Sequence, residues 1–132
     1  MIYYITPREF GGLVIPIPIQ NAYLRHFSSM KNINFSLPVS EVCFPGKYSA
    51  LSKIISRACH ERETIVLVSI HQLPFDKAKE FEDFLSKYKE YKKINLIAAL
   101  EGINTELYEA WKTYREEYIP INKICSRLEW QI

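Results

Sequence analysis

The chain lacks a strong excess of charge of either sign. Its 132 residues include 17 Lys and Arg and 15 Asp and Glu, which gives a formal net charge of +2. A dedicated nucleic-acid-binding domain normally concentrates basic residues on one face. So small an excess argues against a nucleic-acid partner.

Cysteine pairs and metal-ligand spacings are also missing. The three cysteines are far apart, and no C-x-x-C or zinc-type Cys/His spacing occurs (Cys43, Cys59 and Cys125). His26 and His60 fall on expected helices, so His71 has no second histidine at ligand spacing. We therefore expect no metal and no cofactor. An odd cysteine count without a signal peptide is typical of a reducing cytoplasm, where we expect the protein to reside.

No apolar run approaches the ~20 residues that a membrane-spanning helix needs, so we expect no membrane partner. What the chain does contain is four strand patterns alternating with four helix patterns. The expected strands are 2–6, 33–39, 64–70 and 94–100, and the expected helices are 19–31, 47–60, 77–92 and 106–118. Asp76 and Thr105 are the expected caps of the last two helices.

This alternation predicts an α/β fold with right-handed crossovers between parallel strands. We expect one three-layer domain over 1–132, with a mainly parallel four-stranded sheet of resolvase-like or flavodoxin-like type. Residues 119–132 form an expected docking tail, in which Trp130 packs against another surface.

Polar residues follow each expected strand, and the carboxyl ends of parallel strands share one edge, where such folds usually keep their sites. Arg8 and the Gly11-Gly12 pair suit a phosphate or carboxylate. The alternative is a turn beside a surface arginine. The pair belongs to no G-x-G-x-x-G or Walker motif, so it indicates no nucleotide class.

Two polar residues, Gln20 and Asn21, begin the first expected helix, where they either bind a polar ligand or cap the helix. Arg25, one turn later, is either exposed or able to reach the sheet edge and pair with Glu41.

Glu41 and Tyr48 flank the second loop and are the best acid–base candidates. Tyr48 could also stack on a ring. The alternative is a proline-glycine turn closed by an aromatic side chain. Cys43, without a base beside it, is expected to be an inert thiol.

Ser69, His71 and Gln72 end the third strand, and alternation would place Ser69 and His71 on one face. His71 could move protons near neutral pH, or be structural. Glu101, at the end of the fourth strand, is either a reserve catalytic carboxylate or a helix cap.

At these loops the sequence resembles the sporadic carbohydrate cluster proteins, small bacterial proteins encoded in surface-polysaccharide gene clusters. The matching stretches are PREFGGLVIPIPIQNAYLR, LPVSEVCFPGKYSAL and IVLVSIHQLP (7–25, 37–51 and 65–74). His71 stands where the family pattern has an aromatic residue. The resemblance implies a role in making a surface glycan and no assigned reaction.

A weaker resemblance is to the catalytic domain of serine recombinases, in which a Y-x-x-[ST] strand precedes a first helix containing glutamine. YYIT (3–6) would place Thr6 at the nucleophile's position. HQLPF (71–75) lacks the arginines that the family uses, so the resemblance implies fold kinship alone.

The sequence thus predicts a protein of surface-carbohydrate biosynthesis that binds a sugar phosphate or nucleotide sugar. Arg8, Gly11 and Gly12 would hold the anion, while Gln20, Asn21, Ser69 and Gln72 line the ligand. Glu41, Tyr48 and Glu101 would serve a metal-independent isomerase or epimerase. The rivals are a non-catalytic partner of a glycan enzyme and a degenerate recombinase-like nucleic-acid module. The oligomeric state stays open, a homo-oligomer included.

Overall fold

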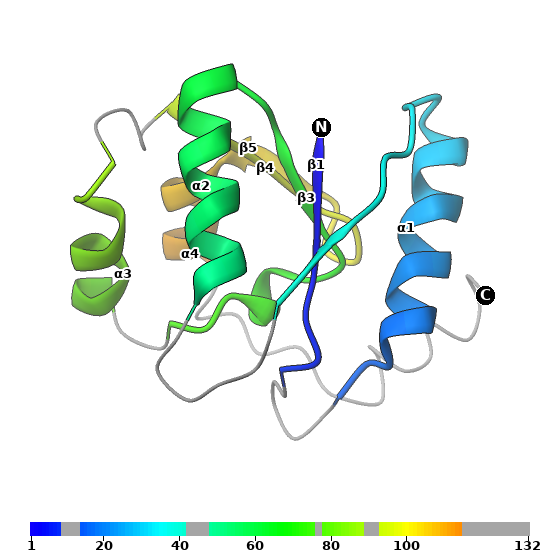
Figure 1. Cartoon of the computed structure of the whole chain (residues 1–132), viewed down its shortest axis with the longest axis horizontal. Coiled ribbons are helices and arrows are strands. Elements are labelled where there is room, and N and C mark those ends of the chain that lie inside the picture. Colours follow the sequence, from blue (N-terminus) through cyan, green and yellow to red (C-terminus); the bar gives the residue numbers. More distant parts are fainter. Residues whose placement is uncertain (9–13, 42–47, 76–77, 89–92, 115–132) are drawn as a thin grey trace.

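A sheet of parallel strands with one antiparallel edge strand runs through the middle of the molecule in the computed structural model (Figure 1). The structure describes residues 1–8, 14–41, 48–75, 78–88 and 93–114. Within these ranges the strands are β1 (Ile2–Ile5), β2 (Val39–Ser40), β3 (Ile65–Leu67), β4 (Asn95–Ala98) and β5 (Ile103–Glu106), in the order β2-β1-β3-β4-β5.

The helices are α1 (Ile17–Met30), α2 (Ser49–Glu61), α3 (Ala78–Leu85) and α4 (Leu107–Tyr114), with a 3₁₀ turn, η1 (Ile70–Gln72), after β3. Helix α1 lies on one face of the sheet, and α2, α3 and α4 lie on the other (Figure 1). The prediction of a three-layer α/β domain with a mainly parallel sheet is therefore confirmed.

Alternation along the strands divides the core into two layers. In β1, Ile2 and Tyr4 pack with α2, α3 and α4, whereas Tyr3 and Ile5 pack with α1. All four side chains are buried because both faces of this central strand are covered.

The sheet has five strands in the described ranges, not the four that we predicted. Residues 103–106, expected to lead into the last helix, form β5, which pairs antiparallel with β4. Gly102 makes the tight connection possible with a φ of +68°, a conformation that glycine adopts freely. Thr105 lies in this strand and is not a cap. Instead the Glu106 carboxylate accepts hydrogen bonds from the backbone of Tyr108 and Glu109 at the start of α4.

Two other boundaries differ from the prediction for local reasons. Helix α1 begins at Ile17, earlier than expected, because Pro18 falls in its first turn, where the missing N–H costs nothing. The second strand is confined to Val39–Ser40, since only Tyr4 and Ile5 of β1 pair with it.

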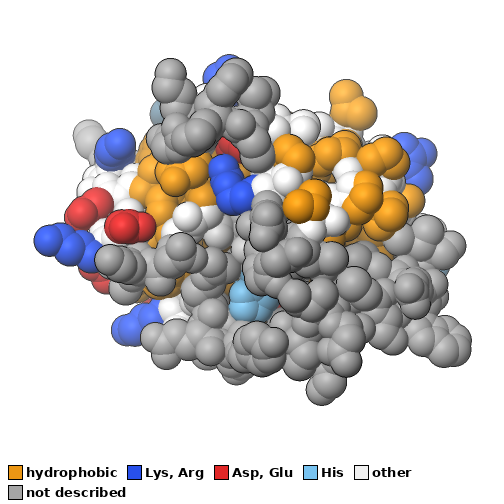
Figure 2. All heavy atoms as spheres, turned by 90° about the horizontal axis from the view of Figure 1, so that it is seen from below, with side chains coloured by type: hydrophobic (Ala, Val, Ile, Leu, Met, Phe, Trp, Pro, Cys, Tyr) orange, Lys and Arg blue, Asp and Glu red, His pale blue; other side chains and the backbone are white. Residues whose placement is uncertain are grey.

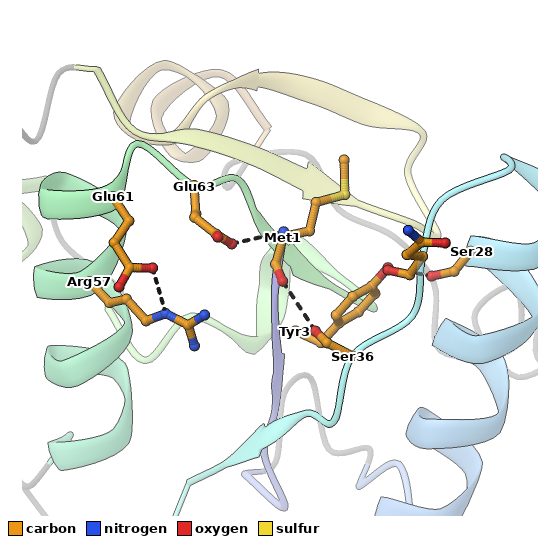
Figure 3. A network of polar contacts seen from close by, with 8 residues as sticks. Met1, Tyr3, Ser28, Ser36, Arg57, Glu61 and Glu63 are labelled. Atoms are coloured by element: carbon orange, nitrogen blue, oxygen red, sulfur yellow. Dashed lines mark hydrogen bonds and ion pairs between the residues drawn. The ribbon is translucent and has the colours of Figure 1, made fainter.

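Polar contacts connect β1 to neighbouring segments at the edge of the sheet where the parallel strands begin (Figure 3). The Met1 amino group pairs with Glu63 at 2.8 Å and thereby lowers the pKa of that carboxyl. The Ser36 hydroxyl donates to the Met1 carbonyl at 3.2 Å, and the Tyr3 and Ser28 hydroxyls lie 2.6 Å apart. These bonds anchor the segment between α1 and β2 to the start of β1.

Candidate anion-binding site

The strand order reverses between β1 and β3, and such a switch point is the usual ligand crevice of an open α/β sheet. Here two glutamines fill it. Gln20 of α1 and Gln72 of η1 are 0% and 1% exposed, and the Gln72 amide donates to the Gln20 carbonyl oxygen at 2.7 Å.

These two amides also satisfy the backbone on both sides of the switch point. Gln20 accepts from the Thr6 N–H at 3.2 Å and donates to the carbonyls of Thr6 and Ile15 at 2.6 and 2.8 Å. Gln72 accepts from the N–H groups of Val68 and Ser69, both at 3.2 Å. The two glutamine side chains thus fill the crevice. A ligand site at this edge of the sheet would therefore lie beside the crevice and not in it.

Glu41 follows β2 and is buried, with 3% of its surface exposed. Its carboxylate accepts from the Ala50 and Leu51 N–H groups at 3.1 and 3.0 Å and from the Tyr4 hydroxyl at 3.1 Å. Glu41 therefore caps the first turn of α2 from outside the helix, where a negative charge also suits the helix dipole.

Arg8 lies next to this capped helix. It is half-buried, and its guanidinium carbon lies 5.1 Å from the centre of the Tyr48 ring, which gives a cation–π contact. No ion pair joins Arg8 to a carboxylate within the described ranges. Its Nη1 is buried and has no hydrogen-bond partner among the described residues. A bound anion could accept a hydrogen bond from this buried cationic donor.

Tyr4 links Arg8 and Glu41 electrostatically. Burial raises the pKa of Tyr4 far above its usual range, the nearby Glu41 carboxylate raises it further, and the Arg8 cation lowers it. Tyr4 thus stays a neutral hydroxyl that donates to Glu41 beside a guanidinium.

A second polar cluster joins the ends of β3 and β4. The Glu101 carboxylate accepts from the Ser69 hydroxyl at 2.9 Å and from the Ile70 N–H at 2.6 Å. Ser69 caps η1 and is fully buried. The expectation that Ser69 and His71 share one strand face is wrong, because β3 ends at Leu67 and the chain turns into η1.

The other predicted site residues lie in α1 or outside the described residues. Asn21 is half-buried in α1, and its Oδ1 has no hydrogen-bond partner in the described part of the chain. Arg25 is exposed and lies 5.0 Å from the Phe35 ring, with no ion pair to Glu41. Gly11, Gly12 and Cys43 lie outside the described residues.

The structure brings Arg8, Glu41 and Tyr48 together at the carboxyl end of β1, as the parallel sheet predicts. Figure 2 views this side of the molecule and shows a basic side chain between two groups of hydrophobic side chains. The polar role of Tyr4 is not predictable from the sequence, because this residue lies in an apolar strand pattern. Phe84 and Tyr88 fall at apolar positions of the expected helix 77–92, a pattern that predicts buried side chains, yet both are half-buried.

Comparison with known proteins supports the fold alone. No family model matches the chain, and no curated protein is similar to it in sequence. A solved structure, the N-terminal catalytic domain of TP901-1 integrase, is similar with a TM-score of 0.56 and 14% identity. The match covers 98% of this chain and 92% of that domain.

The predicted resolvase-like architecture is therefore confirmed, as is the likeness in fold to a recombinase catalytic domain. The resemblance to sporadic carbohydrate cluster proteins stays a prediction. In the part of the chain that the structure describes, no helix is long and apolar enough to cross a bilayer. No three His, Cys, Asp or Glu side chains gather there in a way that could hold a metal ion.

Proposed function

We propose that this domain binds the phosphate of a phosphorylated or nucleotide-linked sugar at the carboxyl end of β1, in the service of surface-carbohydrate biosynthesis. The observation that carries the proposal is Arg8. Its guanidinium lies over Tyr48, keeps a buried N–H donor without a described partner, and forms no ion pair with a carboxylate of the described residues.

The same contacts favour binding over acid–base chemistry at Glu41. Three donors already occupy its two oxygens, and two of these donors are backbone groups of α2. A general base needs a free oxygen within hydrogen-bond reach of the substrate proton. Tyr48 is half-buried at the site and remains the better candidate for contact with a ligand.

The test is calorimetric titration of the whole protein with pyrophosphate, a sugar 1-phosphate and a nucleotide sugar. We expect saturable binding that Arg8→Ala weakens at least about tenfold, since a charge-assisted hydrogen bond contributes about 1.5–3 kcal/mol. The matched control is Arg57→Ala, because Arg57 is an exposed arginine paired with Glu61 at 3.0 Å. Binding that is absent, or unchanged in Arg8→Ala, would overturn the proposal.

A second candidate ligand is the phosphodiester of a nucleic acid, favoured by the fold similarity to an integrase catalytic domain. Titration with a short DNA duplex at two salt concentrations tests it, because binding through several phosphates weakens steeply with salt. Strong, salt-dependent DNA binding without sugar binding would favour this candidate. A non-catalytic partner of a glycan enzyme would be favoured by an exposed apolar patch formed by 119–132 and the last helix, and residues 119–132 lie outside the described residues.

A further inference from the structure

We infer that the anion at Arg8 belongs to a nucleoside diphosphate, and that its base stacks on a strip of partly exposed aromatic rings beside Arg8. This inference rests on the proposed function and narrows its ligand from any phosphorylated sugar to a nucleotide-linked one. The strip is formed by Tyr48 at the start of α2 and by Phe84 and Tyr88 in and just after α3.

The three rings follow one another at regular spacing. The Tyr48 and Phe84 ring centres are 6.2 Å apart, and those of Phe84 and Tyr88 are 6.0 Å apart. All three side chains are half-buried, so each keeps part of its surface open to solvent. Figure 2 shows hydrophobic side chains on both sides of a central basic side chain, with one of the two groups on the side of α3.

Cations flank the strip. Arg8 lies over Tyr48, and the Lys87 amine lies 5.9 Å from the centre of the Phe84 ring. Neighbouring rings of the strip meet edge to face, at interplanar angles of 85° and 60°. Aromatic side chains beside basic groups are the combination that holds bases and phosphates together, because every base offers a flat π surface to a ring. A diphosphate carries more negative charge than a single phosphate ester, which suits a site with two cations.

A rigid layer supports the strip from below. Phe75 and Phe81 are buried, with ring centres 5.0 Å apart, and Phe81 stacks on Trp111 at 4.9 Å. Phe75 contacts both Tyr48 and Phe84 at 5.3 and 4.9 Å. Packing against Phe75 restrains Tyr48 and Phe84, which lowers the entropic cost of ordering these two rings when a base binds.

The arrangement of Arg8 and the rings also favours a nucleoside diphosphate over a sugar phosphate or a DNA duplex. A sugar phosphate would engage Arg8 but offers no flat π surface to the aromatic strip. The bases of a DNA duplex are already stacked on one another and cannot reach the strip. Only a ligand with an unstacked base uses both Arg8 and the rings.

The experiment titrates the whole protein with uridine diphosphate, adenosine diphosphate and inorganic pyrophosphate. We expect the two nucleotides to bind about tenfold more tightly than pyrophosphate, and Tyr88→Leu to remove most of that difference while pyrophosphate affinity stays within about twofold. Tyr88→Phe, which keeps the ring, should bind like the unsubstituted protein. The control is Phe35→Leu, because Phe35 carries an arginine at similar distance on the other face of the sheet.

The outcomes distinguish a failure of base stacking from a failure of the phosphate site. If pyrophosphate binds and nucleotides bind no more tightly, or if Tyr88→Leu changes nothing, the stacking inference is wrong and the proposed phosphate site stands. If neither pyrophosphate nor nucleotides bind, the proposed function fails as well. Unchanged pyrophosphate binding in Tyr88→Leu also shows that the variant is folded.

Discussion

Glu41 illustrates how a single charged residue can serve the fold at the place where a catalytic group is expected. A carboxylate just after a strand in a parallel sheet suggests chemistry. Here its oxygens are used by the first turn of α2 and by Tyr4. A buried carboxylate is stable only with such donors around it, so these contacts explain why this charge is tolerated inside.

Glu41→Gln should therefore destabilise the protein by about 1–3 kcal/mol, because the amide loses the charge and turns an NH₂ group toward backbone N–H donors. Urea unfolding followed by circular dichroism measures the change. Glu61→Gln makes the same substitution in an exposed ion pair of α2 and should shift stability by less than about 0.5 kcal/mol. Equal effects of the two substitutions would contradict the capping role of Glu41.

At the scale of elements, the glutamine pair joins α1, η1 and two strands that are far apart in sequence. Gln20 and Gln72 are separated by 52 positions, yet they share one hydrogen bond and hold the backbone of both strand ends. The sequence showed each residue near an element boundary. It could not show that they meet, because that depends on β1 and β3 being neighbours in the sheet.

Replacing either glutamine with an apolar residue leaves the amide of the other glutamine and several buried backbone groups without a hydrogen-bond partner. Gln20→Leu and Gln72→Leu should each cost about 2 kcal/mol or more, and the double variant should cost clearly less than the sum. A double-mutant cycle by urea unfolding measures this coupling. The pair Asn95 and Asn104, an exposed amide contact at 3.3 Å, is the control and should show almost no coupling. Additive losses at Gln20 and Gln72 would show that the two amides act independently.

The element boundaries were predictable only in part. Strongly periodic segments such as α2 appear close to their expected positions, since their apolar stripe is local information. The edge strand β5 escaped prediction, because Ile103–Glu106 carries mostly polar residues and becomes a strand only by pairing with β4.

On the scale of the whole molecule, the two faces of the sheet are unequally covered. Three helices pack on one face and α1 alone packs on the other within the described ranges (Figure 1). Leu24 of α1 is completely buried in this second layer. Among the described residues, the helix that covers this face is α1, so its buried side chains are expected to contribute much to stability.

Leu24→Ala should cost about 2–5 kcal/mol, because it removes a fully buried side chain from the layer between α1 and the sheet and leaves a cavity there. Leu37→Ala is the matched control, since Leu37 is 86% exposed and its loss should change stability by less than about 0.5 kcal/mol. Thermal unfolding of both variants gives the comparison. A small loss for Leu24→Ala would mean that α1 is not a principal support of the sheet.

The sequence by itself determined the α/β class, the parallel direction of the first four strands and the edge at which Arg8, Glu41 and Tyr48 gather. These follow from local periodicity and from the handedness of strand–helix–strand connections. Only the tertiary structure decided that Gln20 and Gln72 close the switch point, that Glu41 caps α2, and that Arg8 keeps a donor beside an aromatic strip. Those facts depend on contacts between residues distant in the chain, and hydrogen-bond partners are fixed only when such residues are packed together.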